Sequence, residues 1–259
     1  MTVQQRRPRA ATSERREVLV REVRDGNGNI HDLARRLGVS ASTIRRDLRD
    51  LERSGEITRT YGGAVRGPHP HEPTLREKEH GHPREKDAIA RVAADLVEEG
   101  DVILLDAGTT TARLAWHLRE RTGITVIAAG INALAVLAEA PGVELIVLGG
   151  RVRHPGEGIV GPYAEEQLRW VGPDKAFLGA DGVTSRGLCC PSLEQARLKH
   201  AMLEAARTTY VLADASKLGA EPFGYWAPLD RPHTLIVDAA APASEVERLS
   251  ASVLRAHPA

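Results

Sequence analysis

The sequence predicts an α/β protein in two parts, a small helical unit with a β-hairpin followed by an open, mostly parallel α/β domain. Three observations predict this fold class. Residues 1–66 hold short amphipathic helical patterns followed by a Gly-Gly turn. A segment rich in Pro and His then interrupts the apolar pattern. Beyond it, continuously apolar runs alternate with helical patterns, which is typical of parallel strands covered by helices on both faces.

Formal charge separates the two parts. The 259 residues carry 35 Lys and Arg against 35 Asp and Glu, so the net charge is zero. Residues 1–66 hold 15 basic side chains, all Arg, and 9 acidic ones, which gives +6 and leaves −6 for the remainder. Such asymmetry indicates a nucleic-acid or membrane partner for the basic part. The membrane alternative is weak, because no apolar run approaches the roughly 20 residues that span a bilayer.

The start of the chain and its two cysteines are typical of a cytoplasmic protein. Residues 1–9 are basic and polar, with no apolar segment behind them of the kind a signal peptide has. Cys189 and Cys190 are adjacent, so they are poorly placed for a structural disulfide, and a buried pair is favoured over redox or metal chemistry. We therefore expect a soluble cytoplasmic protein with no cofactor and no metal site.

The first part has the pattern of a basic arm, three helices and a hairpin. We expect residues 1–12 to form a flexible arm and residues 13–66 a separate domain. Two short strands around Gly62-Gly63 predict the hairpin. Three helices, the third of them basic, followed by a hairpin are the layout of a winged helix-turn-helix. The expected helices cover about 13–24, 31–37 and 42–54, and the hairpin covers 57–66.

The third helix carries the prediction of DNA binding. Ile44, Leu48 and Leu51 form an apolar stripe, and arginines occupy the opposite face. Arg neutralises phosphates or binds the O6/N7 edge of guanine, and hydroxyls near a helix start suit phosphate or base contacts. The alternative is an ordinary solvated basic face, against which the charge of the whole unit and the basic hairpin weigh. The candidate DNA contacts are Ser40, Ser42, Thr43, Arg45, Arg46, Arg49 and Arg59.

A linker and an α/β domain complete the expected organisation. Residues 67–83 hold four Pro, four His and few apolar residues, which predicts a linker. The histidines could suggest a metal site, but no helical pair, Cys or carboxylate pattern completes one. The α/β domain covers 84–259. Its expected helices lie at about 84–98, 110–121, 132–140, 162–171, 193–206 and 243–256, and its strands at 102–106, 125–129, 144–148, 175–179, 210–213 and 234–237.

The carboxyl ends of these strands carry a candidate anion site. The run 106–110 (Asp-Ala-Gly-Thr-Thr) ends a strand and opens a helix, where glycine, hydroxyls and first-turn N–H groups suit a phosphate. A strand-helix turn that binds nothing is the alternative. Parallel strands bring the segments that follow them to one edge of the sheet. Glu194 and Lys199 rank lowest, since they would suit a helix surface equally well. The candidate effector contacts are Lys86, Asp106, Gly108, Thr109, Thr110, Gly150, Asp181, Glu194, Lys199 and Lys217.

Several of these runs resemble a known family. Residues 30–34 (Ile-His-Asp-Leu-Ala), 43–48 (Thr-Ile-Arg-Arg-Asp-Leu) and 61–64 (Tyr-Gly-Gly-Ala) are similar to the amino-terminal signature of the DeoR-type bacterial transcription regulators. Residues 106–110 and 214–217 (Asp-Ala-Ser-Lys) match the family's sensor domain in order. The resemblance implies a regulator, usually a repressor of sugar-utilisation genes, that a phosphorylated sugar releases from operator DNA. We expect a homo-oligomer, a dimer or tetramer, because binding two half-sites multiplies weak affinities.

An enzyme is the alternative function. The second domain is also similar to ribose-5-phosphate isomerases, whose Gly-Ala-Asp stretch matches residues 179–181. Isomerisation needs a well-placed carboxylate, and residues 182–184 (Gly-Val-Thr) lack the second acidic residue that those enzymes have there. The sequence therefore favours a binding domain without catalytic residues. Residues 128–130 (Ala-Ala-Gly) replace the Thr-Asn usual in DeoR-type regulators, so the identity of the effector does not follow from the family.

Overall fold

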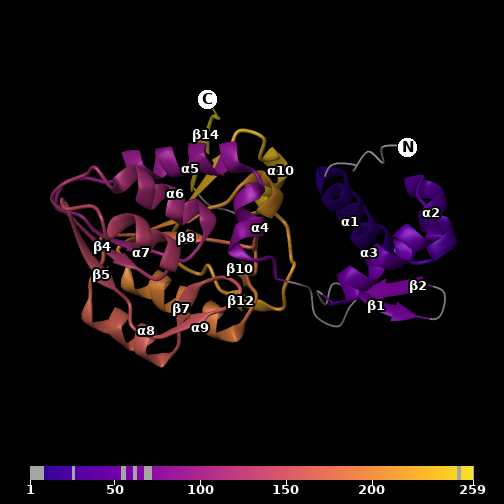
Figure 1. The fold of residues 1–259 in the computed structure, drawn as a ribbon. Coiled ribbons are helices and arrows are strands. Elements are labelled where there is room, and N and C mark those ends of the chain that lie inside the picture. Colours follow the sequence, from indigo (N-terminus) through magenta and orange to yellow (C-terminus); the bar gives the residue numbers. More distant parts are fainter. Residues whose placement is uncertain are drawn as a thin grey trace, which may run out of the picture. The chain divides into compact units, whose positions relative to one another are not determined.

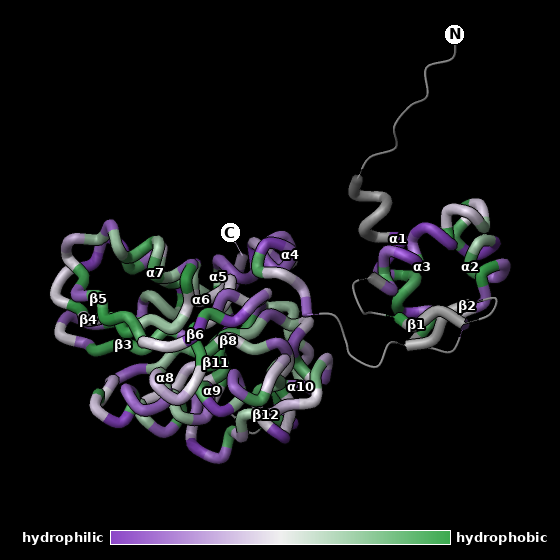
Figure 2. Tube along the Cα trace, turned by 60° about the horizontal axis from the view of Figure 1, so that its bottom comes forward, coloured by the Kyte–Doolittle hydropathy of each residue, from purple (hydrophilic) through white to green (hydrophobic). Residues whose placement is uncertain are grey.

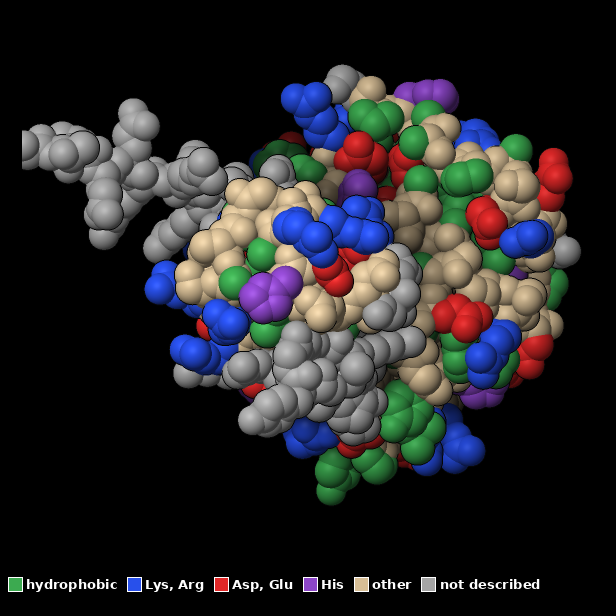
Figure 3. Space-filling model, turned by 90° about the vertical axis from the view of Figure 1, so that its right-hand side faces the viewer, with side chains coloured by type: hydrophobic (Ala, Val, Ile, Leu, Met, Phe, Trp, Pro, Cys, Tyr) green, Lys and Arg blue, Asp and Glu red, His purple; other side chains and the backbone are tan. Residues whose placement is uncertain are grey.

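The computed structural model describes residues 9–24, 27–53, 57–60, 63–66, 72–249 and 252–258, and contacts divide the chain into two units, Met1–His71 and Glu72–Ala259 (Figure 1). Within these described ranges no helix is long and apolar enough to cross a membrane. One face of the molecule, drawn in Figure 3, carries acidic and basic side chains interspersed with one another.

The first unit has the predicted three helices and hairpin. Leu19, Leu33, Ile44 and Leu48 are fully buried in its core, as the apolar stripes predict. The first helix begins at Arg9, so the expected flexible arm is wrong over residues 9–12, and residues 1–8 lie outside the described residues. The elements are α1 (Arg9–Arg24), α2 (Ile30–Leu37), α3 (Ala41–Arg53), and the antiparallel strands β1 (Ile57–Thr60) and β2 (Gly63–Arg66).

Local sequence sets both ends of α2. The Asn29 side chain accepts a hydrogen bond from the backbone N–H of His31 at 2.9 Å, which satisfies one of the free donors of the first turn. Gly38 ends the helix with φ +62°, a left-handed conformation that glycine adopts without a steric cost. The short turn between α2 and α3 follows from this glycine.

The second unit is built on a fully parallel seven-stranded sheet, as the continuously apolar strands predict. Hydrophobic residues concentrate in its central strands (Figure 2). The strands, in spatial order, are β14 (Ser252–Ala256), β13 (Thr234–Asp238), β11 (Thr208–Leu212), β8 (Lys175–Gly179), β3 (Val102–Leu105), β4 (Ile124–Ala128) and β5 (Val143–Val147).

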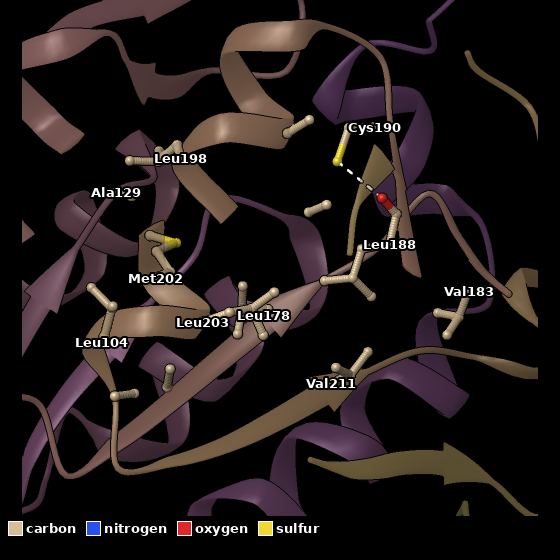
Figure 4. Close-up of a cluster of buried hydrophobic side chains, with 14 of the residues drawn as sticks. Leu104, Ala129, Leu178, Val183, Leu188, Cys190, Leu198, Met202, Leu203 and Val211 are labelled. Carbon is tan, nitrogen blue, oxygen red and sulfur yellow. Dashed lines mark hydrogen bonds between the residues drawn. The ribbon is translucent and has the colours of Figure 1, made fainter. Parts of the chain in front are cut away.

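Helices cover both faces of this sheet. Ile103 and Leu105 of β3 face the cluster formed with α5 (Pro83–Asp95), α6 (Thr109–Leu118) and α7 (Ile131–Leu137). Leu104, between them, faces the opposite cluster with α8 (Pro162–Gln167) and α9 (Leu193–Ala205), because successive strand residues point to opposite faces. Figure 4 shows Met202 and Leu198 in this second cluster with Leu178 and Val211 of the sheet.

The strand order reverses between β3 and β8. From β3 the chain adds β4 and β5 on one side, and β8, β11, β13 and β14 then extend the other side. The connections that leave β3 and β8 therefore run to opposite sides of the sheet. Open α/β sheets bind ligands at such a switch point.

The structure corrects the predicted linker. Residues 72–83 belong to the second unit and contain α4 (Leu75–His80) and the first residue of α5, whereas residues 67–71 lie outside the described residues. Helix α4 begins at a capping box, in which the Thr74 hydroxyl accepts from the Glu77 backbone N–H and the Glu77 carboxylate accepts from the Thr74 N–H at 2.8 Å.

Other boundaries also differ from expectation. The last expected helix, 243–256, is α10 (Ala243–Arg248) followed by the edge strand β14, so its second half was wrong. The expected helix 162–171 ends in the 3-10 turn η1 (Leu168–Trp170). Short strands also occur where we had predicted no regular element: β6 (Arg151–Arg153) pairs with β7 (Gly158–Val160), and β10 (Gly187–Cys190) lies between β9 (Gly182–Thr184) and β12 (Tyr225–Ala227).

The two cysteines form the buried pair expected from their adjacency. Cys189 and Cys190 lie on β10, are free thiols and are fully buried. Burial raises the pKa of Cys190 to about 12, so its thiol stays protonated and unreactive near neutral pH.

Candidate functional site

A buried carboxylate orients α3 in the first unit. Asp47 is 2% exposed, and its oxygens accept hydrogen bonds from Arg15 Nε at 2.7 Å and Arg16 Nε at 3.4 Å, both on α1. Arg16 also pairs with Asp50. These ion pairs and the apolar stripe together hold one face of α3 against α1. Sequence reasoning missed this role of Asp47, because its partners lie about thirty residues away in the chain.

The opposite face of α3 presents the predicted DNA contacts. Arg45, Arg46 and Arg49 are exposed and form no ion pair or hydrogen bond with the described residues. Ser42 and Thr43 lie at the start of the helix, as expected. Three guanidinium groups on one exposed helical face can bind phosphates or guanine edges.

Two of the predicted DNA contacts, Ser40 and Arg59, lie outside α3. The Ser40 hydroxyl accepts from the Thr43 backbone N–H at 3.1 Å and lies 2.8 Å from the hydroxyls of Ser42 and Thr43, so it caps α3. Arg59 lies on β1 opposite Ala64, and its side chain is outside the described residues.

In the second unit, a buried ion pair joins the two strands of the switch point. Asp106 follows β3, and its Oδ2 accepts from the backbone N–H of Gly179 at 3.0 Å and from the Lys199 ammonium. Lys199 also donates to the Gly179 carbonyl at 2.8 Å. Lys199 is 3% exposed, which is incompatible with the surface position that its helix suggested.

The charges of this pair are stabilised locally. Burial lowers the pKa of Lys199, but the attraction of the carboxylates of Asp106 and then Asp181 outweighs burial and holds that pKa above its ordinary value. The second oxygen of Asp106, Oδ1, is buried and has no hydrogen-bond partner among the described residues. A buried acceptor of this kind is costly unless a donor reaches it.

The amino terminus of α6 lies directly after Asp106. Gly108 precedes the helix and supplies no capping side chain, and Thr109 and Thr110 are buried in the first turn. Their hydroxyls make no hydrogen bond with the described residues, whereas Thr111 donates to the Gly108 carbonyl at 3.1 Å. First-turn N–H groups, two hydroxyls and the helix dipole together favour an anion.

The neighbouring connection after β4 supports this loop. A Cβ on Gly130 would lie 2.8 Å from Ala107 Cα, so glycine allows the two connections to approach. Asn132, the second residue of α7, donates from Nδ2 to the Gly108 carbonyl at 2.9 Å. Asn132 therefore supplies a hydrogen-bonding side chain close to residues 128–130, where this chain lacks the Thr and Asn side chains usual in DeoR-type regulators. The sequence analysis did not predict this role of Asn132.

Two lysines approach the same edge from α4 and α5. Lys78 of α4 donates to Asp181 Oδ1 at 2.6 Å, and the ammonium of Lys86, which is 5% exposed, donates to the Lys78 carbonyl. Burial lowers the pKa of Lys86, with Asp214 opposing and Lys217 reinforcing the change. Burial raises the pKa of Asp181, but Lys78, and then Lys217 and Lys199, outweigh it and hold that pKa below its usual value. Lys78 escaped prediction because it lies in the supposed linker.

Lys217 completes the edge. It ends the 3-10 turn η2 (Ala215–Lys217) after β11, where Asp214 caps the turn by accepting from the Ser216 N–H at 3.1 Å. The half-buried Lys217 ammonium has no hydrogen bond to the described residues. Its influence on both Asp181 and Lys86 indicates that it faces the same cluster.

Gly150 and Glu194 have other contacts. Gly150 has φ +153°, and a Cβ there would lie 2.7 Å from the Val160 carbonyl, so glycine serves the close packing of the β6–β7 hairpin. The Glu194 side chain is 46% exposed and pairs with Arg151 at 2.5 Å. Local packing and a local ion pair thus account for Gly150 and Glu194. The other predicted effector contacts lie together near the carboxyl ends of β3, β8 and β11.

Two family models match the chain. The DeoR-like helix-turn-helix domain matches residues 15–67, and the DeoR C terminal sensor domain matches residues 81–239. The putative aga operon transcriptional repressor of Escherichia coli O157:H7 is 35% identical over 92% of this chain and 90% of its own length. The HTH-type transcriptional repressor GlcR of Bacillus subtilis is 35% identical over 78% of each chain. The lactose phosphotransferase system repressor of Lactococcus lactis is 34% identical over 74% of this chain and 77% of its own.

Among solved structures, the ribose 5-phosphate isomerase A of Methanocaldococcus jannaschii matches 51% of this chain and 52% of its own, with a TM-score of 0.38 and 23% identity. The family assignment rests on the two domain models and on relatives that align along most of both chains. The domain order, with the helix-turn-helix before the sensor domain, is the one predicted from the sequence. The chain belongs to the DeoR family of transcriptional regulators.

Proposed function

We propose that this protein is a repressor of carbohydrate-metabolism genes whose binding to operator DNA is controlled by a phosphorylated sugar. The observation that carries the proposal is that one chain has both an exposed arginine face, on α3 of the first unit, and a candidate anion site, at the switch point of the second unit. Relatives named as repressors of the aga operon and of the lactose phosphotransferase system support it.

The DNA-binding step follows from the geometry of α3. Asp47 fixes the helix through α1, so Arg45, Arg46 and Arg49 point outward together. In the proposed complex α3 enters the major groove, and the hairpin of β1 and β2 contacts the backbone. A homo-oligomer presents two such helices, and the second contact is then intramolecular.

The effector step follows from the chemistry at the sheet edge. The first turn of α6 and the ammonium groups of Lys86 and Lys217 would hold the phosphate group. The unpartnered Oδ1 of Asp106 and the carboxylate of Asp181 are acceptors suited to sugar hydroxyls. An effector with both groups would use both halves of the site, and by linkage it must weaken DNA binding by the factor by which DNA weakens effector binding.

Lys217→Ala is expected to remove most of the affinity for the effector while leaving operator binding intact. The reason is that Lys217 offers a charge at the site and has no structural hydrogen bond among the described residues. Calorimetry against a panel of sugar phosphates, followed by mobility shift with the operator, measures both. A wild-type chain that binds no sugar phosphate, or whose DNA affinity none of them changes, would refute the proposal.

The competing enzyme function is disfavoured by the state of the carboxylates. Asp106 is held by Lys199, and residues 182–184 (Gly-Val-Thr) supply no second carboxylate to move a proton between sugar carbons. We expect no aldose–ketose interconversion of ribose 5-phosphate by the full chain, followed by nuclear magnetic resonance of the sugar. Turnover at rates typical of enzymes would contradict a purely regulatory role.

A further inference from the structure

Helix α4 is attached to the second unit mainly through charged side chains. Lys78 pairs with Asp181 at 2.6 Å, and Glu79 accepts from Arg113 of α6 at 2.7 Å. Just before the helix, Glu72 accepts from Arg153 Nη1 at 2.7 Å. None of the six residues of α4 is buried, so these pairs, and not an apolar face, set its position.

These attachments lead to the switch point. Asp181 lies two residues after Gly179, whose backbone N–H donates to Asp106. The Lys86 ammonium reaches the Lys78 carbonyl, and Lys217 and Lys199 both act on Asp181 electrostatically. Lys78 is 19% exposed and Asp181 15%, so the pair is neither fully buried nor freely solvated. A new anion at this edge can therefore compete for Lys78.

We infer that Lys78 is an anion-binding residue of the effector site. Its ammonium pairs with Asp181 when no ligand is bound and with the phosphate group when the ligand binds. The inference rests on the proposed function and deepens it. A phosphate carries more charge and more acceptor oxygens than a carboxylate, so it draws the Lys78 ammonium from Asp181. The freed Asp181 carboxylate then accepts a hydroxyl of the same ligand.

The exchange gives the ligand a route to the DNA-binding unit along the chain. When Lys78 leaves Asp181, α4 loses one of its attachments and keeps the ion pair of Glu79 with Arg113, that of Glu72 with Arg153, and the hydrogen bond from Lys86 to the Lys78 carbonyl. Residues 67–71 alone join this segment to the end of β2. A ligand that repositions α4 thereby acts on the segment covalently continuous with the hairpin of the first unit.

The test exploits the two ends of one ion pair. Calorimetric titration of the full chain with inorganic phosphate, at constant ionic strength, is expected to show an affinity about tenfold or more weaker in Lys78→Met, because a charged donor to the phosphate is lost. Asp181→Asn is expected to strengthen phosphate binding several-fold, because it removes the competing carboxylate. A purely structural ion pair would make the two variants change in the same direction.

Three controls complete the experiment. Lys78→Arg should retain phosphate binding, and Arg76→Met, which removes an exposed charge from the same helix, should leave it unchanged. Urea unfolding of each variant checks that the fold persists. Hydrogen exchange at residues 75–80 should quicken when phosphate is added to the wild type and not to Lys78→Met. Equal affinities in Lys78→Met and wild type, or shifts of the same sign in Lys78→Met and Asp181→Asn, would overturn the inference.

The outcomes separate this inference from the proposed function. If the opposite shifts occur but no sugar phosphate alters operator binding, Lys78 is an anion ligand and the proposed regulation fails. If a sugar phosphate weakens operator binding while Lys78→Met leaves phosphate affinity unchanged, the regulation stands and the role of Lys78 fails.

Discussion

Lys199→Met is expected to lower the free energy of unfolding of the second unit by about 3–5 kcal/mol, the usual cost of leaving one partner of a buried ion pair uncompensated. The side chains of Lys199 and Asp106 are 4% and 1% exposed, so water cannot replace the lost ammonium. The variant also removes the donor to the Gly179 carbonyl. Urea unfolding followed by tryptophan fluorescence measures the change, because Trp116, Trp170 and Trp226 all lie in this unit.

Arg197→Met is the matched control on the same helix. Arg197 pairs with Glu165, but its side chain is 63% exposed, so its loss is expected to cost no more than about 1 kcal/mol. The double variant Asp106→Asn/Lys199→Met should be less destabilised than the sum of the two single variants, because each alone leaves the other group unpaired. Equal losses in Lys199→Met and Arg197→Met would contradict the buried pairing.

Replacing Arg45, Arg46 and Arg49 together by Ala is expected to make the slope of log operator affinity against log salt concentration shallower. The expected change corresponds to the loss of about three phosphate contacts per subunit. Each phosphate neutralised by a protein cation contributes a slope of about −0.9 to the dependence of log affinity on log salt concentration. The three guanidinium groups have no partner among the described residues, so their removal should leave stability nearly unchanged. Mobility shift at several salt concentrations measures both affinity and slope.

Single substitutions distinguish the two kinds of contact. An Arg that reads a base should cost about 1–3 kcal/mol at one operator position, whereas one that binds phosphate should weaken all sequences alike. Arg35→Ala serves as a control, because Arg35 lies on α2 and pairs with Asp32. If the triple variant binds the operator with unchanged affinity and slope, α3 is not the element that contacts DNA.

The parts of the fold that sequence predicts well are those with strong local patterns. The strands of the parallel sheet are continuously apolar, because helices cover both faces, and this pattern needs no knowledge of distant residues. The end of α2 at Gly38 and the Gly-Thr-Thr start of α6 (108–110) are likewise local signals. They were enough to predict which segments meet at the carboxyl ends of the strands, where the candidate anion site lies.

The parts that were missed depend on distant partners. Helix α4 has no apolar stripe, and its ion pair with Asp181 joins residues 103 positions apart, so the segment looked like a linker. Lys199 has the same local context as a surface lysine, and only the fold brings it to Asp106, 93 positions away. Residues 252–256 (Ser-Val-Leu-Arg-Ala) form a segment too short to distinguish a strand from a helix by periodicity.

The buried Asp47 lies between the exposed arginines of α3 and has a different role from theirs. Retargeting this regulator to a new operator would exploit positions 45, 46 and 49, whose side chains make no described contact within the protein. A library that also randomised position 47 would lose folded members, since Arg15 would then face an apolar or uncharged replacement in the interior. In the same helix, an exposed side chain that can be changed to alter operator specificity thus lies next to a buried side chain that the fold of the unit requires.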